Sequence, residues 1–241
     1  MFPDDYLEAR GIIDASRFTM HLDEHLDRFG EGLMGVAFGT SNVRCSHDEL
    51  TAQGIDAGDI RRLTRNFEHP EGWTQPSFEL FAPAADDIEG LMHVVVLQHL
   101  TPELIRRADF LTHANGCIGV NEIVGTVYDV SRCADKMERL LGNDAVTRSE
   151  EGVLLSLASG QSISLLVPDS YLREFGAIAE SPQPDTPRLG AMTLRVASLT
   201  ATATLLQNNG VAFTKPSDGR IRIAPADACG AILQFTESSL G

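Results

Sequence analysis

The feature that most constrains this chain is a pattern that occurs three times along it. The three stretches are LMGVAFGTSNVRCSHDELTAQGI (33–55), IVGTVYDVSRCADKMERLLGNDAV (123–146) and GAMTLRVASLTATATLLQNNGVAF (190–213). Each begins with an apolar run that contains β-branched residues and then passes a short polar turn. A helix-like segment of about ten residues follows and ends near a glycine. Repetition over such a long period predicts duplicated structural units.

Each copy predicts one helix and several strands. The helices should end at Gly54, Gly142 and Gly210, because a glycine there can take the left-handed conformation that closes a helix. In the first copy, Ser46 followed by Glu49 matches a capping box and predicts that the helix begins at Ser46. Closing strands are expected at MHVVVLQ (92–98), SISLLVP (162–168) and GAILQFT (230–236), which are spaced by about 70 residues.

The segments between helix and closing strand support the same unit. GVLLSLASG (152–160) and GRIRIAP (219–225) alternate apolar and polar residues as half-buried strands do. Each unit therefore reads as strand, helix, then two or three strands. The opening stretch MFPDDYLEARGII (1–13) resembles a closing strand, with the carboxylate Glu8 inside it. We expect three complete units preceded by the tail of a fourth, whose remaining strands come from an upstream start or from a partner chain.

Charge and cysteine usage bound the partners and the compartment. The chain of 241 residues has a formal net charge of −15, which argues against a nucleic-acid partner and against an anionic membrane surface. Its four cysteines form no CxxC pair, which is typical of reduced thiols in a cytosolic protein. No apolar run reaches the ~18 residues of a membrane span, and no secretory signal is present. A cytoplasmic location is the expectation.

The order strand, helix, three strands is similar to the βαβββ module of the vicinal-oxygen-chelate superfamily, and the residues resemble its glyoxalase-like branch. QHLTPELIRRADFLTHANG (98–116) resembles the linker between halves in that branch. YLE (6–8), GLMGVAFGT (32–40) and IRIAPADACGAILQF (221–235) resemble its strands. The resemblance implies an α+β fold of tandem βαβββ modules, which form mixed curved sheets, or cups, with helices packed outside. The first module is incomplete.

This resemblance also implies how the chain is divided. Residues 1–116 would form an N-terminal half, with the remnant of module 1 and a module 2 that carries an insertion. Residues 117–241 would form a C-terminal half with modules 3 and 4. A homodimer is expected, which could exchange strands, because each module has open strand edges.

A divalent metal is the cofactor that the resemblance implies, with Zn, Ni, Mn or Fe as candidates. Enzymes of the superfamily commonly hold it with side chains from the first and last strands of paired modules. Glu8 stands where a last-strand ligand is usual, as metal ligand or general base; the alternative is an edge carboxylate that faces water. The sequence departs from the pattern elsewhere: the first strand of module 2 has Gly35 at the ligand position, and module 4 offers Gln234 on its last strand.

Four further residues are candidates for the site. His99 could orient a substrate or act in catalysis, or it could be a structural histidine. Gln98 precedes it and is a substrate-binding candidate, but a slip of one residue would exchange their faces. Arg106 could meet an anionic substrate or form a salt bridge on a solvated face. Trp73, in the inserted HPEGWTQP (69–76), could form part of a lid or pack the insertion down.

Two functions follow from the resemblance. The first is a glyoxalase-like lyase, isomerase or dioxygenase-type enzyme, in which a metal would polarise two neighbouring oxygens of a small molecule and a carboxylate would move a proton. The second is a non-catalytic protein that holds a small molecule in the same cup. The missing ligands favour binding, and the cluster of Glu8, Gln98 and His99 favours chemistry.

Overall fold

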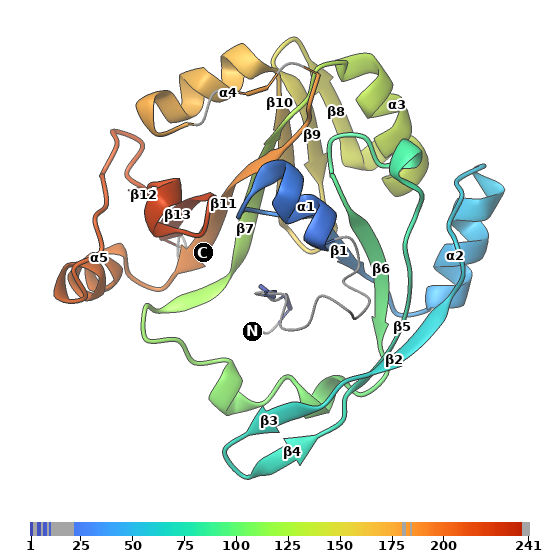
Figure 1. Ribbon diagram of the computed structural model, residues 1–241, viewed down its shortest axis with the longest axis horizontal. Helices are drawn as coiled ribbons and strands as arrows, with labels where there is room; N and C mark the ends of the chain where they lie inside the picture. Colours follow the sequence, from blue (N-terminus) through green and yellow to red (C-terminus); the bar gives the residue numbers. More distant parts are fainter. Residues whose placement is uncertain are drawn as a thin grey trace.

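The computed structural model describes residues 1, 4, 5, 7, 8, 10, 22–179, 182, 183 and 185–237 (Figure 1). This part of the chain contains five α-helices and thirteen strands in a mixed α+β arrangement, as the sequence predicted. Its sheets have four, seven and two strands. The four-stranded and seven-stranded sheets lie on either side of the N-terminus in Figure 1.

Module 2 forms the four-stranded sheet. Its elements are β1 (Val36–Gly39), α2 (Val43–Ala52), β2 (Arg61–Thr64), β5 (Ser77–Phe81) and β6 (Val94–His99). The strand order is β1-β6-β5-β2, in which β1 runs parallel to β6 and the other pairs are antiparallel. The first strand therefore lies beside the last, as the predicted βαβββ module requires. The insertion is a hairpin of β3 (Phe67–His69) and β4 (Gly72–Thr74) between β2 and β5.

Module 3 repeats this topology. Its elements are β7 (Cys117–Thr126), α3 (Val130–Leu141), β8 (Val146–Ser149), β9 (Gly152–Ser156) and β10 (Ser162–Leu166). The order is β7-β10-β9-β8, and β7 is again parallel to β10. The match with module 2 confirms the repeat at the level of strand pairing.

Module 4 has the same order with one strand fewer. Its elements are β11 (Leu189–Val196), α5 (Leu199–Asn208), β12 (Ile221–Ile223) and β13 (Ile232–Glu237). β11 is parallel to β13, and β13 is antiparallel to β12. A bridge between Thr214 and Arg222 stands where the module's remaining strand would lie. The linker from module 3 carries a further helix, α4 (Pro168–Phe175), which the repeat did not predict.

Modules 3 and 4 share one sheet. Their first strands, β7 and β11, pair antiparallel in the centre of the seven-stranded sheet β12-β13-β11-β7-β10-β9-β8. The strand β1 holds the corresponding edge position in module 2. Among the described residues, the nearest link from that edge is a single bridge between Leu33 and Leu189. Six 3₁₀ turns complete the described structure, at Ala85–Asp87, Pro102–Leu104, Ala108–Phe110, Asn143–Ala145, Gly176–Ile178 and Pro225–Asp227.

Helix ends were predicted better than helix starts. Gly54, Gly142 and Gly210 all have a positive φ, as a closing glycine should. The predicted start of α2 at Ser46 is wrong, because the helix begins at Val43 and the Asn42 side chain caps it by accepting a hydrogen bond from the backbone of Cys45. Asparagine is as good a cap as serine, and the Ser46 and Glu49 pair lies inside the helix.

The N-terminal segment holds a helix, α1 (Leu22–Phe29), before module 2. Of the strand expected within residues 1–13, residues 1, 4, 5, 7, 8 and 10 are described, and none of them belongs to a strand. Tyr6, Ala9 and residues 11–13 lie outside the described residues.

One apolar core joins module 2 to module 3. Ile55, Leu91 and Val94 of module 2 pack in the same cluster as Met137 of α3 and Leu165 of β10. A second core lies under α5, and a third lies between α4 and the seven-stranded sheet. The helices α2, α3 and α5 thus cover one face of their sheets, and we call the opposite face of each sheet its inner face.

Candidate functional site

The inner face of module 2 is defined by strand alternation. On β6, Val96 and Gln98 point toward α2, so Leu97 and His99 lie on the inner face. On β5, Phe78 lies opposite His99 in the ladder, which places it on the inner face as well. The structure therefore settles which of Gln98 and His99 faces away from the helix.

Gln98 has a structural contact on the helix side. Its Oε1 accepts a hydrogen bond of 3.0 Å from the backbone N–H of Val43, the first residue of α2. A helix start leaves such donors without intrahelical partners, so the glutamine anchors α2 to the end of β6.

His99 lies among aromatic and cationic groups. Its ring meets Phe78 edge to face, with 5.0 Å between ring centroids. Burial lowers the pKa of His99, and the nearby charge of Arg106 lowers it further. Both effects disfavour the imidazolium, so His99 is predominantly neutral at pH 7 and can accept a proton.

Arg106 and Glu8 each contact a distant segment of the same chain. The Arg106 guanidinium reaches the backbone carbonyl of Asp4 at 3.4 Å. The Glu8 carboxylate accepts from Arg65 at 3.3 Å, and both side chains of this ion pair are about half exposed. Leu63 of β2 pairs with Phe78 and lies on the inner face. Arg65 directly follows β2, two residues after Leu63, so its side chain lies on the same face. Glu8 thus lies at the rim of the inner face of module 2.

Trp73 lies on the β3–β4 hairpin with 66% of its surface exposed. It pairs across the hairpin with Glu68, which is also exposed to solvent. The residue that packs the insertion down is Phe67, whose ring meets Phe110 edge to face at 5.3 Å. The structure does not bring Trp73 into contact with His99 or Arg106.

The donor set of the described residues does not fit a divalent metal. No group of three or more His, Cys, Asp or Glu side chains converges in that part of the chain. On the inner face of module 2, β1 presents Ala37 and Gly39, which supply no ligand. The Glu8 carboxylate is paired with Arg65, and a single imidazole at His99 leaves the set incomplete.

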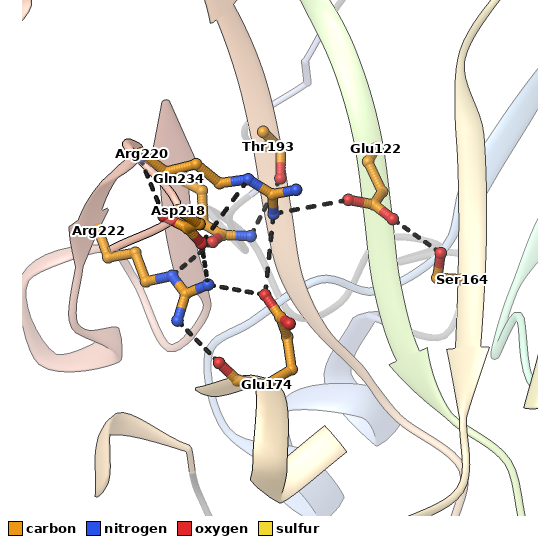
Figure 2. A network of polar contacts seen from close by, with 8 residues as sticks. All are labelled: Glu122, Ser164, Glu174, Thr193, Asp218, Arg220, Arg222 and Gln234. Carbon is orange, nitrogen blue, oxygen red and sulfur yellow. Dashed lines mark hydrogen bonds and ion pairs between the residues drawn. The ribbon is translucent and has the colours of Figure 1, made fainter. Parts of the chain in front are cut away.

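The inner face of modules 3 and 4 carries a network of polar contacts (Figure 2). Ser164 of β10 donates to Glu122 of β7 at 2.7 Å, and Gln234 of β13 donates to Thr193 of β11 at 3.1 Å. Each module therefore pairs a polar residue of its first strand with one of its last strand. These four residues offer one carboxylate, which is too few for a metal centre.

Helix α4 closes this second inner face. Tyr171 and Phe175 pack against Val124, Ala191 and Ile232 of the sheet. Arg222 of β12, only 8% exposed, donates to Gln234 at 2.7 Å, to the Glu174 carboxylate at 2.7 Å and to Asp218 at 2.8 Å (Figure 2). Because Glu174 belongs to α4, the buried arginine fixes the linker helix in place.

Sequence reasoning missed this network, although one signal for it was present. In IRIAP, the alternation that predicted a strand also places the Arg222 side chain on the other face of that strand from Ile221 and Ile223. An arginine on the buried side of a strand needs acceptors. Gln234 is the cross-strand partner of Arg222 in β13, but Glu174 lies 48 residues away in the linker helix and could not be identified from the sequence.

The N-terminal segment also contacts modules 3 and 4. Both carboxylate oxygens of Asp5 accept from the backbone N–H of Val120 in β7, at 3.1 and 3.2 Å, and one also accepts from Gln161 at 2.8 Å. Asp5 and Glu8 therefore tie the start of the chain to both large sheets.

Comparison with known proteins agrees with this architecture. The sequence profile of the family described as glyoxalase-like domain matches residues 1–141, more than half of the chain. The chain therefore belongs to the glyoxalase-like domain family. With its paired βαβββ modules, it is a member of the vicinal-oxygen-chelate superfamily, which confirms the resemblance seen in the sequence. Among curated proteins, none matches the chain in sequence.

Solved structures share the fold at low sequence identity. A hypothetical protein from Staphylococcus aureus aligns with a TM-score of 0.61 and 9% identity, over 89% of this chain and 70% of that chain. A triple mutant of 4-hydroxymandelate synthase from Streptomyces coelicolor aligns with a TM-score of 0.52 and 13% identity, over 89% and 72%. Methylmalonyl-CoA epimerase from Mycobacterium tuberculosis is 21% identical over 54% of this chain and 95% of that chain, with a TM-score of 0.41. The first two likenesses establish a common fold.

Proposed function

We propose that this protein binds a small organic anion with neighbouring oxygens on the inner face of module 2. The observation that carries the proposal is the position of His99, which lies on that face against the ring of Phe78 and within reach of the charge of Arg106. The corresponding face of modules 3 and 4 is covered by α4, apart from a small cleft at its end. The inner face of module 2 is therefore the surface on which a ligand of this fold would be held.

The charges at the rim favour an anion. The chain has a net charge of −15, yet Arg65 and Arg106 both lie at this face. Arg65 holds the Glu8 carboxylate and Arg106 contacts the carbonyl oxygen of Asp4, so both guanidinium groups already bind oxygen atoms. A carboxylate ligand would offer them a bidentate partner. In this proposal, Glu8 and the ligand compete for the same arginine.

The rings define the other half of the site. Phe78 and His99 would pack against the apolar part of the ligand. Trp73 remains a proposed ligand contact because a large aromatic surface is exposed on the inserted hairpin. We do not assign Gln98 a direct contact, since its side-chain carbonyl anchors α2.

A second candidate function is a glyoxalase-like isomerase or lyase. The neutral imidazole of His99 is suited to take a proton from a carbon next to a carbonyl group, and Arg106 is placed to stabilise the resulting enolate oxygen. With an α-hydroxy carbonyl compound, His99 would return the proton to the former carbonyl carbon while the hydroxyl proton passes to the other oxygen, so the reaction is balanced as an isomerisation. The metal-assisted form of this function would need ligands beyond Glu8 and His99.

Binding can be tested by calorimetry with a panel of 2-oxo and 2-hydroxy acids, from pyruvate to phenylpyruvate. We expect saturable binding that His99→Gln and Arg106→Gln each weaken by about tenfold or more. Arg107→Gln is the matched control, because Arg107 adjoins Arg106 but pairs with Glu71 and Asp109. Equal losses in the Arg106 and Arg107 variants, or no binding by any acid, would contradict the proposal.

The two functions are separated by a second measurement. Incubation of the bound acid in D₂O should give exchange at the carbon next to the carbonyl if His99 moves a proton, and no exchange if the protein only binds. Elemental analysis of protein purified without chelator tests the metal-assisted form. One metal ion per chain, lost in Glu8→Ala, would support it.

The remaining expectations concern assembly and location. No helix in the part of the chain that the structure describes is long and apolar enough to cross a membrane. We propose a cytoplasmic protein without a nucleic-acid partner, which forms a homodimer through the β1 edge of module 2. Light scattering tests the dimer, and a monomer at working concentration would contradict it.

A further inference from the structure

A cleft lies at the far end of the second inner face, on the other side of Tyr171 from the polar network. It is enclosed by the end of α1, by α4 and by the ends of β7, β11 and β13, and its volume is about 100 Å³. Two arginines, Arg28 and Arg188, contribute to its wall. Among the described residues that line it, none is an aspartate or a glutamate. In a chain with a net charge of −15, this lining offers two guanidinium groups to an anionic ligand.

Arg188 is held rigidly in this wall. Its backbone N–H donates to the Thr126 hydroxyl at 3.1 Å, and its carbonyl accepts from the Thr126 N–H at 2.8 Å. Its guanidinium contacts the backbone carbonyls of Phe29 and Glu31, each at 3.3 Å. A carboxylate or phosphate oxygen would be a stronger acceptor than these carbonyls.

The rest of the wall limits the size and the kind of ligand. Arg28 lies over the ring of Phe29 with 4.9 Å between the guanidinium carbon and the ring centroid. Thr126 and Gln183 add polar groups, and Phe29 and Ile232 add apolar surface. A space of about 100 Å³ accepts an oxyanion with a few further non-hydrogen atoms.

We propose that this cleft binds a small oxyanion, either inorganic phosphate or a short carboxylate, between Arg28 and Arg188. The site is separate from the inner face of module 2, and the inference does not depend on the proposed function. The nearby His25 of α1 is consistent with a strong local field: burial lowers its pKa first, and the charge of Arg188 lowers it further.

The experiment measures thermal unfolding of the full chain with phosphate, succinate or acetate, at constant ionic strength set by chloride. Binding to the folded state raises the midpoint in a saturable manner. We expect saturation below about 20 mM for phosphate or for succinate, and the better of the two identifies the oxyanion. Without saturation for any of the three anions, the proposal is overturned.

Variants show whether the effect comes from the cleft. Arg28→Gln should weaken the apparent affinity by about tenfold or more without changing the midpoint in chloride alone, because Arg28 is exposed. Arg173→Gln is the control with the same change in charge: Arg173 is exposed on α4 and pairs with Glu151 at 3.0 Å. Equal weakening in both variants would indicate non-specific screening and overturn the proposal.

A residue-level readout completes the test. Phosphate should shift the His25 ring resonances in the unaltered chain, because the ion would partly neutralise the field of Arg188. The shift should be lost in Arg28→Gln and kept in His99→Gln. A shift that depends on His99 instead would place the anion on the inner face of module 2 and overturn this assignment.

Discussion

The guanidinium of Arg222 donates a hydrogen bond of 2.7 Å to the carboxylate of Glu174. This bond joins β12 of module 4 to the linker helix α4, and its two residues are 48 positions apart along the chain. 

Because Arg222 is buried and also binds Gln234 and Asp218, the sheet, the loop before β12 and the helix are fixed to one another through a single side chain.

The first prediction concerns this arginine. Arg222→Met keeps an unbranched apolar stem but leaves the buried Gln234 amide and the Glu174 carboxylate without their donor. We expect the free energy of unfolding to fall by about 2–3 kcal/mol, measured by urea denaturation. Arg173→Met removes an ion pair in which both side chains are 68% exposed and should cost less than about 1 kcal/mol. Equal losses in the two variants would show that Arg222 does not hold α4.

The second prediction concerns Gly190 at the start of β11. A Cβ placed there would lie 2.1 Å from the hydroxyl oxygen of Tyr171, and that ring is packed between α4 and the sheet. Gly190→Ala should therefore lower the free energy of unfolding by about 1–3 kcal/mol. Combining it with Tyr171→Phe should cost less than the sum of the two single changes, because the ring carbon is the next contact at 2.9 Å. Strict additivity in the urea midpoints would refute the contact.

The third prediction is a pH dependence. Burial, and then Arg106, lower the pKa of His99, so below pH 6.5 the unfolded chain takes up a proton that the folded chain resists. The contribution to stability is thus complete above pH 6.5 and is lost as the pH falls from there through the folded pKa. His99→Gln should make the stability profile less steep in this range. An unchanged slope would contradict the assignment.

Nuclear magnetic resonance titration of the His99 ring gives a direct measurement of the same effect. In Arg106→Gln the pKa should rise toward 6.5 but stay below it, because burial is the larger cause. In Arg107→Gln it should not move, since that arginine is paired with Glu71 and Asp109.

The fourth prediction concerns the thiols. Burial raises the pKa of Cys117 to about 11 and that of Cys133 to about 12, whereas Cys45 and Cys229 are exposed. Iodoacetamide at pH 8 should therefore modify two cysteines in the folded protein and all four after unfolding, as counted by mass spectrometry. The Cys45 thiol donates to Glu49 at 3.2 Å, which raises its pKa, so Glu49→Gln should speed its modification. Rapid labelling of Cys133 in the folded chain would contradict the core packing.

The fold was largely predictable from the sequence because the units repeat. Strand alternation, glycine at helix ends and the spacing of closing strands are local signals, and each is seen more than once. The cap of α2 was wrongly predicted because two local signals competed, and Asn42 prevailed over Ser46. Helix α4 was missed because Pro168 was taken as the end of a strand, whereas it occupies the first turn of the helix.

The site was less predictable because it depends on facing and on distant contacts. Gln98 and His99 are adjacent, and the sequence could not say which of them faces α2. The partners of Glu8 and Arg222 come from segments far along the chain, namely Arg65 and Glu174. No periodicity encodes such pairs. The roles of Glu8, His99, Arg106 and Trp73 in binding or catalysis stay predictions.

The apolar core shared by modules 2 and 3 has a consequence for dissecting this protein. Helix α3 also attaches its polar side to module 2, where Arg132 and Lys136 pair with Glu89 and Arg139 pairs with Asp87. A cut between residues 116 and 117 would follow the boundary of the duplication. It would also divide the apolar core that modules 2 and 3 share. We expect either fragment alone to expose an apolar surface and aggregate, while co-expressed fragments should reassemble. The duplicated modules can therefore be recognised one by one in the sequence, but modules 2 and 3 depend on each other to fold.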